Sequence, residues 1–190
     1  MLRSALLCLA FALLSGCASM ADRLRGSLTP PPGRAYAILS LTGKAFNPDL
    51  ATVGMSVRDA QGRVAAEDAA SLLTDTVFGE EGMSPVEGKL VLLDLPPGDY
   101  RLAGVWGHWS EDGVFGSDLK MKQFRLDAPF HLDAGETVYL GQVQLEMSFL
   151  PEVKLGDEQK RDFGHMRRVW KIPDLSRVAV RPLRLAGPRP

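Results

Sequence analysis

Two cysteines and three histidines are the side chains with most scope for covalent or metal chemistry among the 190 residues. Cys17 stands after an apolar run, residues 5–14, and directly after the small residues Ser15 and Gly16. A cysteine thiolate is a strong nucleophile, and small residues before it let the chain enter a peptidase cleft in an extended form. Arg3, the short apolar run and the small residues are together typical of a secretory signal peptide. As a helix the run would rise only about 15 Å, half of what a bilayer requires, so it does not predict a mature transmembrane span.

The four residues Leu14-Ser15-Gly16-Cys17 resemble the lipobox of bacterial lipoproteins. The resemblance implies that a diacylglycerol is attached to the sulfur of Cys17, that residues 1–16 are removed, and that the freed amine receives a third acyl chain. Several acyl chains hold a protein firmly in a membrane. Ala18 and Ser19 follow Cys17, and the lack of aspartate there implies, by resemblance to Gram-negative lipoproteins, the periplasmic face of the outer membrane. The alternative is a secreted protein with a cysteine at this position.

The remaining chemistry-bearing residues predict no metal site and no cofactor. Cys8 lies within the predicted signal, so an acylated Cys17 would leave no thiol for a disulfide or a cysteine metal site. The histidines, His108, His131 and His165, are scattered, whereas metal ligands usually pair at short spacing. Neither a P-loop nor a G-x-S-x-G nucleophile elbow is present.

Composition points to one globular domain and excludes some partners. The chain is 45% hydrophobic and 24% charged, which suits a single domain and not a disordered chain. The formal charge of -1 argues against nucleic acid as a partner, because such proteins normally carry a basic excess.

The sequence divides into four predicted parts. Residues 1–16 form the lipoprotein signal peptide, and residues 17–33 form the lipidated cysteine and a proline-rich spacer. Pro30-Pro31-Pro32-Gly33 favours a stiff polyproline stretch, and as a coil the spacer would span about 20–25 Å. Residues 34–185 form the β-sandwich domain, and residues 186–190 a basic tail.

Alternating apolar residues predict a mainly-β fold, an antiparallel sandwich of about seven strands with one C-terminal helix. Val53, Met55 and Val57 share one face, and a second row from Tyr139 to Met147 is also expected to point inward. Pro129 lacks an N–H, so its strand should lie at an edge or contain a bulge. The seven strands are expected at residues 35–41, 52–58, 90–95, 100–105, 123–133, 139–147 and 177–183.

One clear helix is predicted over residues 157–170. Asp157 is suited to cap it, and Phe163, Met166 and Trp170 follow helical spacing that would bury one stripe. A second short helix is predicted over the alanine-rich residues 64–73.

Two segments carry a resemblance to known β-sandwiches. Leu95-Pro96-Pro97-Gly98-Asp99-Tyr100-Arg101-Leu102 resembles the hairpin of prealbumin-like and carboxypeptidase-regulatory-like domains. Residues 130–141 resemble a motif of uncharacterised families of small Gram-negative outer-membrane lipoproteins. The resemblance covers roughly residues 85–170, and it implies turns and core positions but no catalytic residue.

The segment 106–117 is predicted to be an exposed loop with unusual aromatic content. Trp106, His108 and Trp109 are candidate contacts for an envelope protein or a glycan, because aromatic side chains offer large contact area. Trp106 fits the inward register of its strand, so Trp109 is the preferred contact. The alternative is that Trp106 is core and Trp109 only covers the end of the sandwich.

We therefore expect a non-enzymatic interaction or accessory module, anchored in the cell envelope through the lipid on Cys17. A protein that binds an envelope glycan or a small ligand is the alternative. A periplasmic hydrolase is a further alternative, which would require Asp or Glu pairs brought together by folding.

Overall fold

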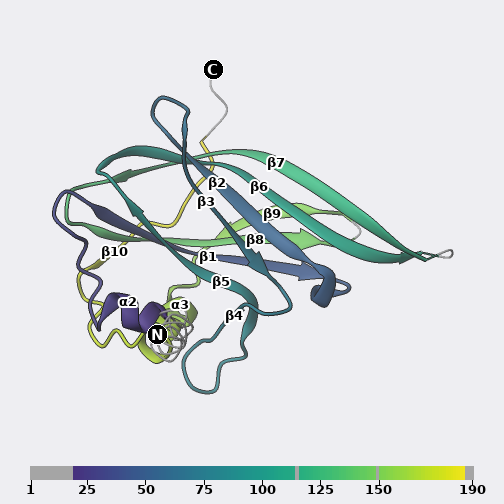
Figure 1. Ribbon diagram of the computed structural model, residues 1–190, viewed down its shortest axis with the longest axis horizontal. Coiled ribbons are helices and arrows are strands. Elements are labelled where there is room, and N and C mark those ends of the chain that lie inside the picture. Colours follow the sequence, from purple (N-terminus) through teal and green to yellow (C-terminus); the bar gives the residue numbers. More distant parts are fainter. Residues whose placement is uncertain (1–18, 114–115, 149, 187–190) are drawn as a thin grey trace, which may run out of the picture.

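The computed structural model describes residues 19–113, 116–148 and 150–186. Two β-sheets pack face to face, and two helices cover the outer face of one of them (Figure 1). The mainly-β sandwich predicted from the sequence is therefore confirmed. The described part holds ten strands rather than seven, and each of the seven predicted segments overlaps one of them. Within the same residues no helix is long and apolar enough to cross a membrane.

The six-stranded sheet contains the first and the last strand of the described chain, β1 and β10. Its strand order is β10-β8-β1-β5-β4, and β9 pairs with the C-terminal half of β8, residues 142–146. The prediction of a wholly antiparallel sandwich was wrong, because β8 runs parallel to β1 and to β10. The strands of this sheet are β1 (Ala35–Ala45), β4 (Thr76–Val77), β5 (Val86–Leu95), β8 (Thr137–Met147), β9 (Glu152–Gly156) and β10 (Val178–Val180).

The four-stranded sheet has the order β3-β2-β6-β7 and is antiparallel throughout. Pro129 lies on β7, an edge strand, as its missing N–H requires. The helix predicted over residues 64–73 is instead strand β3, because pairing with β2 outweighs the helix propensity of alanine. The strands are β2 (Thr52–Asp59), β3 (Val64–Ser71), β6 (Gly98–Gly113) and β7 (Gly116–Leu132), and a short 3-10 helix, Pro48–Leu50, precedes β2.

Two apolar clusters hold these layers together. The larger fills the space between the sheets and includes Val53, Met55 and Val57, all fully buried as predicted. The smaller lies between the six-stranded sheet and helices α2 (Met20–Leu24) and α3 (Gln159–Arg168). Helix α3 confirms the helix predicted over residues 157–170, and its apolar stripe is buried in this cluster.

Part of the segment predicted as an extended spacer, residues 19–28, is instead folded onto the domain, whereas the predicted signal peptide, Cys17 and residues 187–190 of the predicted tail lie outside the described residues. Ser19 and Asp22 form a capping box that starts α2, with the hydroxyl of Ser19 accepting from the Asp22 N–H at 3.2 Å. Leu24 and Leu28 are buried against the six-stranded sheet, and the Thr137 hydroxyl donates to the Leu28 carbonyl at 2.6 Å. Apolar burial and this hydrogen bond therefore hold residues 20–28 on the domain.

The Pro96-Pro97-Gly98 turn was predicted as a hairpin, but it joins two different sheets. β5 pairs with β1 and β4, whereas β6 pairs with β2 and β7. Two consecutive prolines donate no N–H groups, so they favour a crossing between layers over a paired hairpin.

Candidate binding site

Strand β6 contains a bulge at Ala103 that decides which way its two tryptophans point. Leu102 pairs with Val57 of β2, whereas Gly104 pairs with Ser56, so Ala103 is an extra residue in the strand. Pairing with β7 shifts at the same place. An extra residue moves every later side chain to the opposite face of the sheet.

Trp109 consequently points into the sandwich and Trp106 points out of it. Trp109 is 3% exposed within the larger cluster, and its indole N–H donates to Oε1 of Glu111 at 2.8 Å. Trp106 is half-buried on the outer face of the four-stranded sheet. The predicted orientation was therefore wrong for both tryptophans, because the alternation was counted without the bulge.

The predicted loop over residues 106–117 is mostly strand. β6 continues to Gly113 and β7 begins at Gly116, while residues 114–115 lie outside the described part of the chain. Any contact made by the described part of this segment is therefore made by a sheet face, which is more rigid than a loop.

Trp106 and His108 are the two predicted contact residues that the structure brings together on the surface. The indole of Trp106 rests on Gly54 of β2, where an added Cβ would clash with Cε2 of the ring. The imidazole of His108 lies nearly parallel to it, with 6.1 Å between ring centroids and 11° between planes. Glycine at position 54 thus lets the indole lie close to the sheet.

Two exposed apolar side chains extend this aromatic pair along the hairpin. Met121 of β7 stands opposite His108, and Leu119 stands opposite Ser110. Directly paired residues share one face of a sheet, and both side chains are 75% exposed. We call Trp106, His108, Leu119 and Met121 the outer-face patch.

Sequence reasoning missed Leu119 and Met121, although a signal for them existed. They alternate with Lys120 and Lys122, which is the period of a strand with one apolar face. They lie between the predicted loop, which ended at residue 117, and the predicted strand, which began at residue 123, so the alternation was not followed there.

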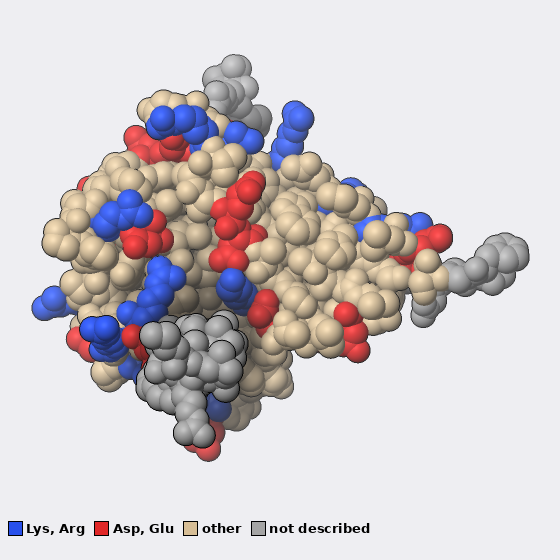
Figure 2. All heavy atoms as spheres, in the orientation of Figure 1, with Lys and Arg blue, Asp and Glu red and all other residues tan. Residues whose placement is uncertain are grey.

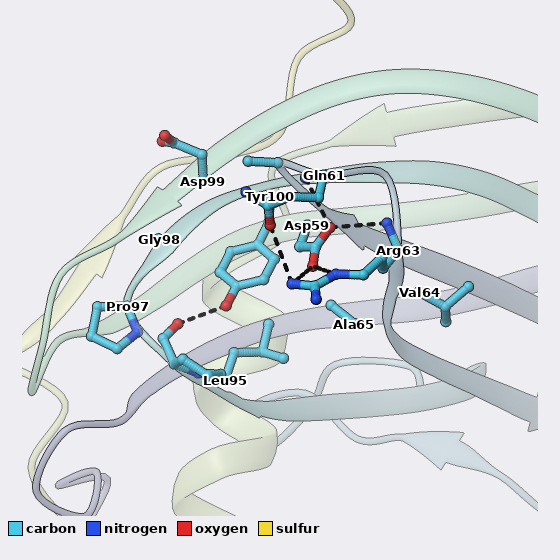
Figure 3. A pocket seen from close by; sticks show the side chains of 12 residues that line it. Asp59, Gln61, Arg63, Val64, Ala65, Leu95, Pro97, Gly98, Asp99 and Tyr100 are labelled. Carbon is cyan, nitrogen blue, oxygen red and sulfur yellow. Dashed lines mark hydrogen bonds and ion pairs between the residues drawn. The ribbon is translucent and has the colours of Figure 1, made fainter.

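An open groove lies at the other end of the four-stranded sheet. It has a volume of about 630 Å³ and lies between the β2–β3 turn and the β5–β6 connection (Figure 3). The carboxylate of Asp59 accepts the backbone N–H groups of Gln61 and Arg63, each at 2.9 Å, and the Arg63 Nε–H at 2.8 Å. The Tyr100 hydroxyl donates to the Pro96 carbonyl at 2.8 Å. These contacts explain the shape of the two turns and engage the polar groups that line the groove.

The groove does not bring its two carboxylates together. Figure 3 shows Asp99 pointing away from Asp59, which faces Arg63. Asp99 instead contacts His131, whose Nδ1 lies 2.7 Å from its Oδ1. Among the described residues no group of three or more His, Cys, Asp or Glu side chains could hold a metal ion.

His131 should titrate above the ordinary histidine pKa of 6.5. The hydrogen bond with Asp99 raises this pKa, and a weaker one with Asp133 at 3.3 Å acts the same way, although desolvation opposes both. The stabilisation by protonated His131 is complete below the unfolded pKa and is lost as pH rises through the raised folded pKa. Proton NMR titration should show Asp99→Asn lowering the pKa of His131 more than Asp133→Asn does. A wild-type value at or below 6.5 would contradict this.

A closed polar cluster fastens α3 to the six-stranded sheet. The carboxylate of Asp162 accepts from the hydroxyls of Tyr139 at 2.6 Å and Ser40 at 2.7 Å, and from Nε of Arg161 at 2.8 Å. Burial raises the pKa of Asp162 and, together with the Asp162 charge, that of Tyr139. Asp162 and Tyr139 are completely buried, so the cluster is a structural joint and offers no access to a substrate.

Tyr139 reaches this cluster because of a second bulge. The β1–β8 pairing passes from Ile38 with Tyr139 to Ser40 with Gln142, and Gly141 has a φ of +85°. Tyr139 therefore faces the helices, and its predicted place in the inward row of β8 was wrong.

His165 of α3 lies beside the polar cluster, and its burial lowers its pKa to about 4. Its Nδ1 accepts the Phe78 N–H at 3.0 Å, which requires a neutral ring and fits that low value. His165 thus has a structural role in joining α3 to the segment after β4.

Comparison with known proteins adds little to this geometry. No family model and no curated protein matches the chain. One solved structure that resembles it is a leucine-rich repeat protein from Bacteroides thetaiotaomicron, at 17% identity and a TM-score of 0.29. The similarity covers 64% of this chain but only 15% of that protein, so neither its fold nor its function is carried over. Membership in a lipoprotein family stays a prediction.

Proposed function

We propose that this protein is a lipid-anchored module of the cell envelope, at the periplasmic face of the outer membrane. It binds another envelope component through the outer-face patch and acts without catalysis. The lipobox-like residues before Cys17 support the anchor. The observation that carries the binding role is the patch itself, where Met121, opposite His108, and Leu119, opposite Ser110, are each 75% exposed.

A protein is the partner that the patch fits best. Contiguous exposed apolar side chains commonly mark interaction sites, and Trp and Met are enriched at protein interfaces. The patch also reaches β7, an edge strand whose pairing with strands is on one side only among the described residues. A partner could therefore bury apolar area and also contact the edge of the sheet.

The anchor is tested by intact-protein mass spectrometry after detergent extraction of the envelope. We expect acyl mass on Cys17 in the wild type and none in Cys17→Ser. Membrane fractionation of the same cells then gives the location. A wild-type chain without acyl mass would overturn the anchor.

The binding role is tested by crosslinking in cells followed by recovery of the protein and its partner. Met121→Gln should reduce recovery at least about fivefold, because a buried thioether contributes apolar area that an amide does not. Leu150→Gln is the matched control, since Leu150 is 79% exposed but outside the patch. Equal recovery with both variants would place the site elsewhere.

An envelope glycan is the second candidate partner, and the position of Trp106 favours it. An indole lying on a bare glycine backbone, parallel to a neighbouring imidazole, suits stacking against the apolar face of a sugar ring. Co-sedimentation with purified cell-wall sacculi that Trp106→Ala abolishes would support the glycan. Loss of the crosslinked protein without any sedimentation would support the protein partner.

A further inference from the structure

The residues just after Cys17 cannot act as a long tether. Helix α2 begins at Met20, and Leu24 and Leu28 are buried with Trp170 against the six-stranded sheet. Two extended residues span at most about 7 Å, so Cys17 lies within that distance of Ser19. A lipid on Cys17 would therefore enter the bilayer next to α2.

The surface around α2 carries four exposed cations. Lys171 is adjacent to this segment, since its carbonyl oxygen lies 3.8 Å from the Cβ position of Gly26. Arg177 lines one 230 Å³ cavity together with residues 26–30. In the described part of the chain none of the four forms an ion pair between side chains. They are Arg23, Arg25, Lys171 and Arg177.

Two carboxylates on the same surface offset part of this charge, and a third, Glu136 in the cavity that Arg177 lines, forms an ion pair with Arg181. Asp22 accepts the N–H and hydroxyl of Ser19, and Asp174 accepts the Ser176 N–H. Hydrogen bonds lower the pKa of each, so both remain charged. The surface is nevertheless net positive, whereas the whole chain has a formal charge of -1. Figure 2 shows Lys and Arg side chains, with Asp and Glu side chains among them, at the end where Figure 1 places α2 and α3.

We propose that Arg23, Arg25, Lys171 and Arg177 form the membrane-facing surface of the protein and bind the phosphates of anionic phospholipids. This inference rests on the proposed acylation of Cys17, because the short connection brings the surface against the headgroups. Basic side chains beside an acyl anchor add a second, electrostatic attachment to anionic lipid. The C-terminal end of β6 and the N-terminal end of β7 lie at the opposite end of the molecule from α2, so this end of the hairpin points away from the bilayer (Figure 1).

The test uses the full acylated protein in two kinds of vesicle. One kind is phosphatidylcholine alone, and the other is an equal mixture of phosphatidylcholine and phosphatidylglycerol. Hydrogen exchange of backbone amides in residues 20–28 and 170–178 should be at least about threefold slower in the mixed vesicles, and high salt should remove the difference. Changing the four cations to Gln should also remove it.

A matched control keeps this result specific. Lys122→Gln and Arg125→Gln remove two exposed cations of β7 and should leave the lipid-dependent protection unchanged. Acyl mass on Cys17 combined with equal exchange in both vesicles would overturn the headgroup surface and leave the proposed anchor standing. A chain without acyl mass would overturn both.

Discussion

Replacing Asp162 with alanine is expected to lower the free energy of unfolding by about 3–5 kcal/mol. The carboxylate is fully buried and accepts from Tyr139, Ser40 and Arg161. Its removal leaves the guanidinium of Arg161, itself only 5% exposed, as an uncompensated buried charge. Urea unfolding at neutral pH measures the change.

Two further variants make the expectation sharper. Tyr139→Phe removes one donor and should cost about 1.5–3 kcal/mol, since it deletes a hydrogen bond to a charged group. Glu152→Ala breaks the ion pair with Lys154 at 2.8 Å, where both side chains are about half exposed, and should change the stability little because solvent screens the pair. If Asp162→Ala were as mild as Glu152→Ala, the cluster would not be the joint between α3 and the sheet.

The sequence predicted the strands well where alternation was unbroken. Val53, Met55 and Val57 are fully buried, and Phe124 and Leu132 lie in or against the same cluster. An uninterrupted period of two leaves one consistent way to bury a strand, so local pattern and tertiary packing agree.

The errors in side-chain direction come from two bulges that leave little trace in the sequence. Ala103 shifts the face of every later residue in β6, and the bulge near Gly141 does the same in β8. Glycine at 141 is a weak signal, but alanine at 103 gives none, because a bulge is fixed by pairing across several strands. The candidate site was therefore located on the correct strand but assigned to the wrong tryptophan.

Tertiary contacts also determine the structure of two segments that were predicted wrongly, the predicted helix at residues 64–73 and the part of the predicted spacer at residues 20–28. The alanine-rich strand β3 has helical propensity, yet pairing with β2 satisfies its backbone and buries Ala70. Residues 20–28 lie in a polar and proline-rich stretch of the sequence, yet Leu24 and Leu28 are buried in the same apolar cluster as Phe163 of α3. The Ser19–Asp22 capping box was the local signal that the second segment folds.

Trp109→Ala should destabilise the domain by about 3–5 kcal/mol, whereas Trp106→Ala should cost about 1 kcal/mol. Trp109 is 3% exposed in the larger cluster and has its N–H bonded to Glu111, so its loss leaves a cavity and an unpaired acceptor. Trp106 lies on the outer face, and solvent replaces much of what it contacts. Thermal and urea unfolding of the two variants measure the difference.

Partner binding by folded protein should be reduced more by Trp106→Ala than by Trp109→Ala, which is the reverse of their effects on stability. Trp106→Ala should reduce partner recovery in the crosslinking experiment at least about fivefold, as expected for an aromatic residue central to an interface. Trp109→Ala, assayed at a temperature where it remains folded, should retain most of the recovery, because it presents no surface to a partner. Acrylamide quenching gives an independent check, since Trp106 should be the tryptophan most accessible to the quencher. If Trp106→Ala unfolded the domain and Trp109→Ala left it intact, β6 would lack the bulge at Ala103, and the outer-face patch would lose its central residue.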